Sequence, residues 1–140
     1  MKANELMIGD WVKFPTSDLC YKVYAVQGKS VKIDKQYWHK ADNLEPVLFT
    51  PEILDKNFPP MYEDDYRYTK RENGIGVDIN YTILKPGGYD QLRMRKEPEW
   101  LCWWMKINYG KTPVVMINFN YVHELQHALR LCGIEKEIEL

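Results

Sequence analysis

The sequence predicts an α+β protein: an N-terminal SH3-like small β-barrel, a short linker helix, and an antiparallel β meander with one C-terminal helix. Three observations predict this class. Short apolar segments alternate with polar residues between turns, one amphipathic helical pattern lies near the end, and the composition is that of a folded domain. Of the 140 residues, 45% are hydrophobic and 14% are aromatic, which favours a packed core over disorder.

The chain has the length of one domain, and we expect it to contain three consecutive parts. Residues 1–47 form the SH3-like β unit, residues 48–60 form the linker helix, and residues 61–140 form the meander with its helix. The two β units could pack together as a single domain.

Four or five short strand patterns in the first part predict the small barrel. Pro15 ends the first strand, and the Gln27-Gly28-Lys29 turn joins the next two strands as a hairpin. The predicted strands lie at residues 9–14, 22–26, 30–34 and 36–39.

The linker carries the signals of a short helix. Thr50 can cap its start and Pro51 suits the first helical position. Pro59 and Pro60 then prevent the helix from continuing.

After the linker, strand patterns and turn residues predict an antiparallel meander. In its fourth strand, Leu101, Trp103 and Met105 share one face, while Trp100 and Trp104 lie on the other. We therefore expect this strand to be central and covered on both faces near its start. The predicted strands lie at residues 66–71, 76–84, 89–96, 100–109 and 114–119.

The C-terminal helix is predicted to follow a cap at Asn118 or Asn120 and to run to about Cys132. Gly133 is placed to adopt the left-handed conformation that ends many helices. The tail, residues 135–140, alternates in polarity and could return as an edge strand whose charges discourage further pairing.

Composition and charge argue against several functional classes. The 19 basic and 20 acidic residues leave a net charge of −1, so no overall excess of Lys and Arg draws the chain to nucleic acid or membranes. No apolar run approaches the length that spans a bilayer, and the N-terminus lacks a signal-peptide pattern. Three widely spaced cysteines indicate reduced thiols. We therefore expect a cytoplasmic protein with no membrane partner.

Three segments of the chain resemble a family of small uncharacterised Bacteroides-type proteins that are associated with prophages and mobile elements. The segments are ELMIGDWV at residues 5–12, LEPVLFTPEIL at 44–54 and YVHELQH at 121–127. The resemblance implies a mobile-element setting and no particular activity. In that family Gln commonly stands at the position of Glu124, and Asn can replace the residue at His127, so the resemblance implies that no zinc enzyme is formed.

The HELQH sequence of the C-terminal helix matches the zinc-peptidase pattern HExxH. His123 and His127 are four residues apart and share a helix face, so both could bind one zinc ion, with Glu124 as the general base. A zinc-dependent hydrolase is therefore one hypothesis, and zinc binding without catalysis is another.

Three observations count against the hydrolase. The helix has an ordinary amphipathic pattern, which predicts that His123 and His127 lie on the solvent-facing side. No His-x-x-Gly-x-x-His extension supplies a third ligand, and a chain of this size leaves little room for a second lobe and a substrate cleft. We therefore interpret the match as coincidental. The predicted apolar side comprises Tyr121, Val122, Leu125, Ala128, Leu129 and Cys132, and the predicted polar side comprises His123, Gln126, His127 and Arg130.

A third hypothesis concerns single-stranded nucleic acid. Arg93 and Arg95 alternate along a predicted strand and should share one sheet face, which Trp104 could join. Such a face could bind phosphates and stack bases, but we favour an ordinary solvated sheet face because the net charge is not basic. The sequence favours a non-enzymatic binding or accessory protein with a protein partner, ahead of the zinc-dependent and nucleic-acid-binding alternatives.

Overall fold

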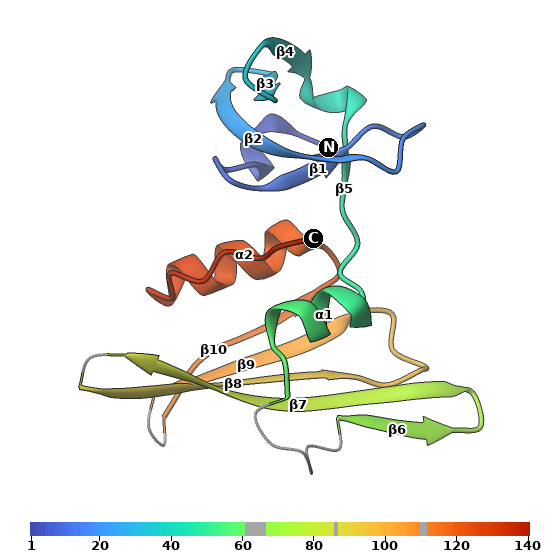
Figure 1. Cartoon of the computed structure of the whole chain (residues 1–140), viewed down its shortest axis with the longest axis vertical. Helices are drawn as coiled ribbons and strands as arrows, with labels where there is room; N and C mark the ends of the chain where they lie inside the picture. Colours follow the sequence, from blue (N-terminus) through green and yellow to red (C-terminus); the bar gives the residue numbers. More distant parts are fainter. Residues whose placement is uncertain (61–66, 86, 110–111) are drawn as a thin grey trace.

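The computed structural model describes residues 1–60, 67–85, 87–109 and 112–140. It contains two five-stranded antiparallel sheets, and two α-helices lie in the described part of the chain (Figure 1). The predicted α+β class is confirmed. The helix α2 (Val122–Leu131) lies between the two sheets, and the short helix α1 (Pro51–Asn57) covers the second sheet beside it (Figure 1).

The first sheet has the strand order β4-β3-β2-β1-β5. The predicted hairpin is confirmed, because Gln27 and Ser30 face each other across the turn between β2 and β3. Among the described residues the sheet is open, with β4 and β5 as its edges, and no closed barrel is formed. The strands are β1 (Trp11–Lys13), β2 (Cys20–Gln27), β3 (Ser30–Ile33), β4 (Tyr37–Lys40) and β5 (Glu45–Pro46). Short 3₁₀ turns occur at Ala3–Glu5 and Ala41–Asn43.

The predicted linker helix is α1. Thr50 Oγ1 accepts a hydrogen bond from the Ile53 N–H at 3.4 Å, and Pro51 occupies the first turn, as the sequence predicts. The helix ends at Asn57, two residues before Pro59.

The second sheet is the predicted meander, in the order β10-β9-β8-β7-β6. The strand β9 lies between β8 and β10 and is central, as predicted, but it begins at Trp103 rather than at residue 100. The strands are β6 (Tyr68–Arg71), β7 (Gly74–Lys85), β8 (Gly88–Lys96), β9 (Trp103–Tyr109) and β10 (Thr112–Phe119). Residue 66, predicted to start the first of them, lies outside the described residues.

Two expectations about this strand are wrong. Leu101 lies in a bend before β9 with 93% of its surface exposed, because the chain turns where the Trp100 N–H donates to the Glu97 carbonyl. The strand is also not covered on both faces near its start. Trp103 is buried on the core face, whereas Trp104 is half-buried on the opposite face.

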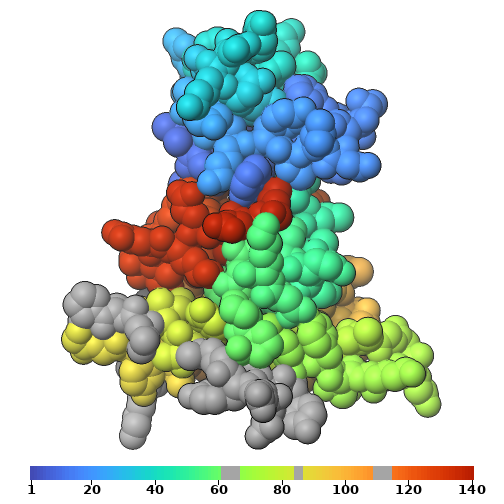
Figure 2. Space-filling view, in the orientation of Figure 1, coloured from blue at the N-terminus to red at the C-terminus, as the bar shows by residue number. Residues whose placement is uncertain are grey.

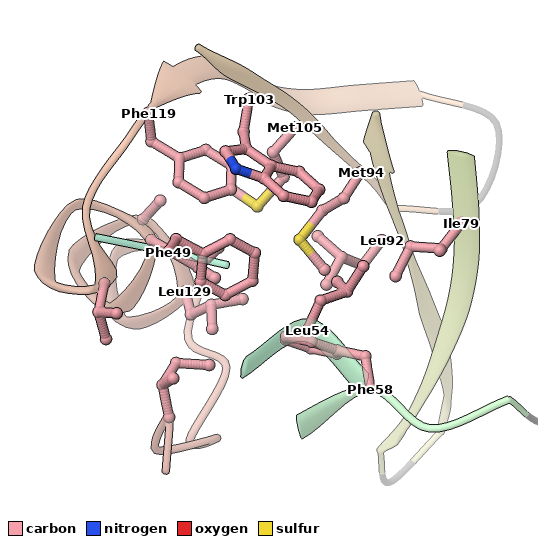
Figure 3. Close-up of a cluster of buried hydrophobic side chains, with 14 of the residues drawn as sticks. Phe49, Leu54, Phe58, Ile79, Leu92, Met94, Trp103, Met105, Phe119 and Leu129 are labelled. Atoms are coloured by element: carbon pink, nitrogen blue, oxygen red, sulfur yellow. The ribbon is translucent and has the colours of Figure 1, made fainter. Parts of the chain in front are cut away.

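The main core lies on one face of the second sheet, beneath α1 and α2 (Figure 3). Phe49 connects the linker to this core, because its ring packs edge-on against the rings of Trp103 and Phe119 at centroid distances of 5.2 and 5.3 Å. The core residues with the lowest exposure are Leu54, Phe58, Ile79, Leu92, Met94, Met105, Val122, Leu125 and Leu129.

The helix α2 ends as predicted, with Gly133 in the left-handed conformation at φ 70°. Its start differs from the prediction, because neither Asn118 nor Asn120 caps it with a side chain. Instead, Glu124 Oε2 accepts hydrogen bonds from the backbone N–H groups of Asn120 and Tyr121 at 2.8 and 3.1 Å. The predicted apolar side is buried, with Leu125 and Leu129 fully covered.

The tail after Gly133 is not the edge strand that its alternation predicts. Gln126 holds it through two hydrogen bonds, from Nε2 to the Lys136 carbonyl and from the Ile138 N–H to Oε1, at 2.8 and 2.7 Å. Asn57 binds both backbone groups of Glu139 in the same manner. Two side-chain amides therefore replace the neighbouring strand that a β edge would need.

The tail also reaches the first sheet. Ile138 is 1% exposed, and its carbonyl accepts a hydrogen bond from the Trp11 indole N–H at 2.8 Å. Figure 2 shows the C-terminal segment at the waist between the N-terminal unit and the second sheet. No helix in the described ranges combines the length and the apolar character needed to cross a bilayer.

Candidate functional site

The polar side of α2 is largely covered by other parts of the chain, so the prediction that the histidines face solvent is wrong. His123 is 7% exposed and Gln126 is 4% exposed, because the N-terminal unit and the tail cover this side of the helix. The rings of His123 and His127 lie edge-to-face with their centroids 5.6 Å apart. The helix pattern gave the correct polarity but could not show which distant segments pack on it.

His127 takes part in a buried cluster that joins α2 to the N-terminal unit. Its Nε2 lies 2.7 Å from Asp10 Oδ2, and the Asp10 side chain is 0% exposed. Asp10 also accepts a hydrogen bond from the Met7 N–H at 2.7 Å, and its other oxygen lies 3.5 Å from Arg130 Nη1. A buried carboxylate needs such partners to offset its desolvation.

Gly9 fits this cluster for two physical reasons. Its φ of 91° is one that side chains larger than hydrogen rarely adopt, and a Cβ atom there would lie 2.6 Å from Arg130 Nη2. The Gly9-Asp10-Trp11 segment therefore brings its backbone, a carboxylate and an indole N–H against α2 and the tail.

His123 faces a different environment. Its Nδ1 is buried and has no hydrogen-bond partner in the described residues. Burial lowers the pKa of the imidazole, while the nearby Asp10 and Glu124 carboxylates oppose that shift. A hollow of about 620 Å³ adjoins this end of α2 and is lined by Met1, Glu5, Pro46, Tyr121, His123, Glu124 and His127.

The residues present do not form a zinc site in this arrangement. One carboxylate oxygen of Glu124 accepts two backbone N–H groups at the helix start, and His127 Nε2 is bound to Asp10. Within the described ranges, no three side chains of His, Cys, Asp or Glu are grouped to hold a metal ion. The hydrolase hypothesis, with Glu124 as base, therefore gains no support from the geometry.

The predicted basic face does come together. Arg95 lies directly across from Trp104 on the neighbouring strand, and Arg93 lies across from Lys106, all on the sheet face opposite the core. Asp78 on β7 is on the same face and binds Arg93 through both carboxylate oxygens, at 2.9 and 2.6 Å.

Acidic side chains neutralise much of this positive charge. Arg95 Nη2 lies 2.6 Å from Glu97 Oε1, and its guanidinium carbon lies 5.5 Å from the centre of the Trp100 ring. A nucleic-acid phosphate would have to displace these partners. The pattern is that of a solvated sheet face stabilised by cross-strand ion pairs.

A second hollow, which the sequence did not predict, lies at one end of the second sheet. Its volume is about 410 Å³, and three large apolar side chains on its rim are exposed to solvent: Leu48 at 60%, Ile75 at 61% and Leu101 at 93%. They come from the linker, the start of β7 and the bend before β9. We call this hollow the apolar groove. Its lining residues are Leu48, Phe49, Thr50, Pro51, Ile75, Val77, Lys96, Leu101, Trp103, Asn120 and Tyr121.

The apolar groove has one charged side chain among the described residues that line it. Lys96 extends across its floor with Nζ 5.8 Å from the centre of the Trp103 ring. The backbone beneath the rim is fixed, because the Phe49 N–H donates to the Asn120 carbonyl at 2.8 Å and Leu48 pairs with Tyr121. The backbone that carries Leu48 is therefore held in place beside the start of α2.

One sequence signal could have indicated the groove. Pro98 interrupts the polar stretch before Trp100, and a proline there favours a bend over an early strand start. A bend would have placed Leu101 outside the sheet. The meeting of Leu101 with Leu48 and Ile75 has no counterpart in any local pattern.

Comparisons with protein-family models, with curated proteins and with solved structures found no match.

Proposed function

We propose that the protein is a non-enzymatic binding module that holds an apolar segment of a partner protein, next to an acidic residue of that partner, in the apolar groove. The observation that carries this proposal is the convergence of Leu48, Ile75 and Leu101, exposed at 60%, 61% and 93%, on one hollow whose described lining has one cation.

The physical reasoning starts from the cost of exposing apolar surface. Each such side chain would gain about 1.5–3 kcal/mol on full burial. A cluster of exposed apolar residues around a concave surface is typical of interaction sites rather than of ordinary protein surface.

The charge at the groove specifies the partner further. The Lys96 ammonium lies beside the apolar floor and is the one charge that the described lining offers. A carboxylate of the partner would pair with it, whereas a basic partner would meet like charge. We therefore expect a segment with two apolar residues close to an Asp or a Glu.

Screening of a phage-displayed random peptide library on the immobilised full chain tests the proposal. We expect enrichment of peptides that combine apolar residues with an acid. Binding of an enriched peptide, measured by fluorescence anisotropy, should weaken about tenfold or more in Leu101→Ser, as expected for an interface hot spot. Lys96→Met should weaken it less.

Matched substitutions separate the groove from general surface effects. Leu131 is 83% exposed at the end of α2, so Leu131→Ser removes a similar side chain elsewhere and should leave peptide binding unchanged. Lys106→Met on the opposite sheet face is the corresponding control for charge. Failure to enrich any peptide, or equal binding by Leu101→Ser and wild type, would contradict the proposal.

We also propose that the N-terminal unit has the strand arrangement of an SH3-like fold, with its sheet open among the described residues. Its support is the five short antiparallel strands, in which β1 pairs with both β2 and β5 and so connects strands from the two ends of the segment. A cytoplasmic, mobile-element setting is likewise proposed. It is supported by the free thiols of Cys20, Cys102 and Cys132 and by the sequence resemblance.

A further inference from the structure

One edge of the second sheet lacks the charged residues that usually prevent edge strands from pairing. The edge strand β10 is eight residues long and contains no charged residue. Natural edge strands are usually protected by charges, by shortness or by a covering element. In the described part of the chain, β10 pairs only with β9, so its outer edge carries free backbone N–H and C=O groups.

The β6 part of the other edge of this sheet is protected. The strand β6 has four residues, all exposed, and two of them are Lys70 and Arg71. Two copies that paired along β6 would bring these cations close together. The edges of the first sheet are also short, with four residues in β4 and two in β5. Among the four strands that end the two sheets, β10 is therefore the longest and the one without a charged residue.

Apolar residues lie on both faces of β10. Met116 is 63% exposed on the outer face, next to Lys106. Ile117 lies on the core face and is only partly buried, although it packs against the main core. A neighbouring strand would cover both side chains and satisfy the free backbone groups at the same time.

We propose that two copies of this chain pair along β10 in antiparallel orientation and join their second sheets into one continuous sheet. Antiparallel self-pairing is the closed, two-fold arrangement of such an edge. It places no like charges opposite each other, because the strand has none. This inference goes beyond the proposed function and does not depend on the apolar groove.

The pairing segment can be narrowed to Val115–Phe119. Pro113 has no N–H to donate, and the register against β9 shifts between Pro113 and Val115. A two-fold axis then passes near Met116 or Ile117. In the first register the two Met116 side chains face each other at about 5 Å, and in the second they are diagonal neighbours at about 7–8 Å.

The test is the mass of the full chain in solution, measured by sedimentation velocity over a concentration series. Wild type should form a dimer. Met116→Lys and Met116→Glu each place like charges close together in either register and should raise the dimer dissociation constant about tenfold or more. An equimolar mixture of the two variants should restore a dimer of mixed composition, which a variant that merely failed to fold could not do.

Leu19→Lys is the matched control, since Leu19 is 67% exposed in the N-terminal unit. It should dimerise as wild type does. A wild-type chain that is monomeric at every concentration would overturn the proposal. So would a dimer that neither Met116 variant weakens, or a pair of weakened variants that do not associate when mixed.

Discussion

Replacing Gln126 with leucine should lower the free energy of unfolding by about 2–3 kcal/mol. The Gln126 side chain is 4% exposed and makes two hydrogen bonds to the tail, one to the Lys136 carbonyl and one from the Ile138 N–H. Leucine has a similar volume, so the cavity contribution should be small. The loss comes from the backbone groups that are left without partners.

The two hydrogen bonds do not contribute equally. An unsatisfied buried polar group costs about 1–3 kcal/mol. The bond from the Ile138 N–H is buried, so its loss should cost an amount near the upper part of that range. The Lys136 carbonyl is only partly buried, and water can replace its partner. Together these give the expected total.

Denaturant unfolding followed by tryptophan fluorescence measures this loss, provided that the m-value stays constant. Gln91→Leu is the control, because Gln91 is exposed on β8, and it should change stability by no more than about 0.5 kcal/mol. Amide hydrogen exchange gives a second readout, since protection of the Ile138 N–H should fall in Gln126→Leu. Equal stability of the two variants would refute the reasoning.

Three further predictions concern the region where α2 and the tail connect the two sheets, which we call the joint. Ile138→Ala should cost about 2–5 kcal/mol, since Ile138 is 1% exposed, whereas Leu131→Ala should cost less than about 0.5 kcal/mol in the same denaturant assay. Stability should fall as the pH drops below the ordinary His pKa of about 6.5, because the pKa of His123 is lowered by burial and the unfolded state then binds the proton more readily. Between pH 7 and pH 5, the free energy of unfolding should fall less in His123→Gln than in wild type. The same pH dependence in both proteins would count against this assignment. Glu124→Ala should lower the free energy of unfolding by about 0.5–2 kcal/mol, because the hydrogen bonds at the helix start are lost. Glu124→Gln keeps an accepting oxygen and should retain most of the wild-type melting temperature. Equal losses of stability in the two variants would contradict this role of Glu124.

Local patterns were sufficient for most of the secondary structure. Thr50 and Pro51 mark the start of α1, Gly133 marks the end of α2, and the alternation of apolar residues marks the meander, because each signal acts within a few residues. The tail differs, since its partners are the side chains of Gln126 and Asn57 rather than a neighbouring strand. No local pattern distinguishes an edge strand from a segment held in that way.

The candidate sites show the same limit more clearly. Polarity placed His127 on the correct side of α2, but its partner Asp10 is 117 residues away in the sequence. The groove likewise depends on the meeting of Leu48, Ile75 and Leu101. Packing of the whole chain decides which distant segments meet. The sequence prediction therefore placed the polar side of α2 in solvent, although the N-terminal unit covers it.

Residues 5–12, 44–54 and 121–127 meet where α2 and the tail connect the two sheets. Asp10 and Trp11 of the first segment contact α2 and the tail. In the second segment, the Val47 carbonyl accepts a hydrogen bond from the Val122 N–H of the third at 2.9 Å. The HELQH sequence therefore has a structural task in this chain, which is to connect two sheets.

The position of the tail has a consequence for biosynthesis. The Trp11 indole N–H binds a carbonyl that lies 127 residues later in the chain. The residues of both sheets are therefore synthesised before the segment that connects them. Contacts between such distant residues slow folding, because a long loop must close before they form. A nascent chain that ends before residue 134 lacks this segment, so the contact between Trp11 and Ile138 forms only after translation has passed Ile138.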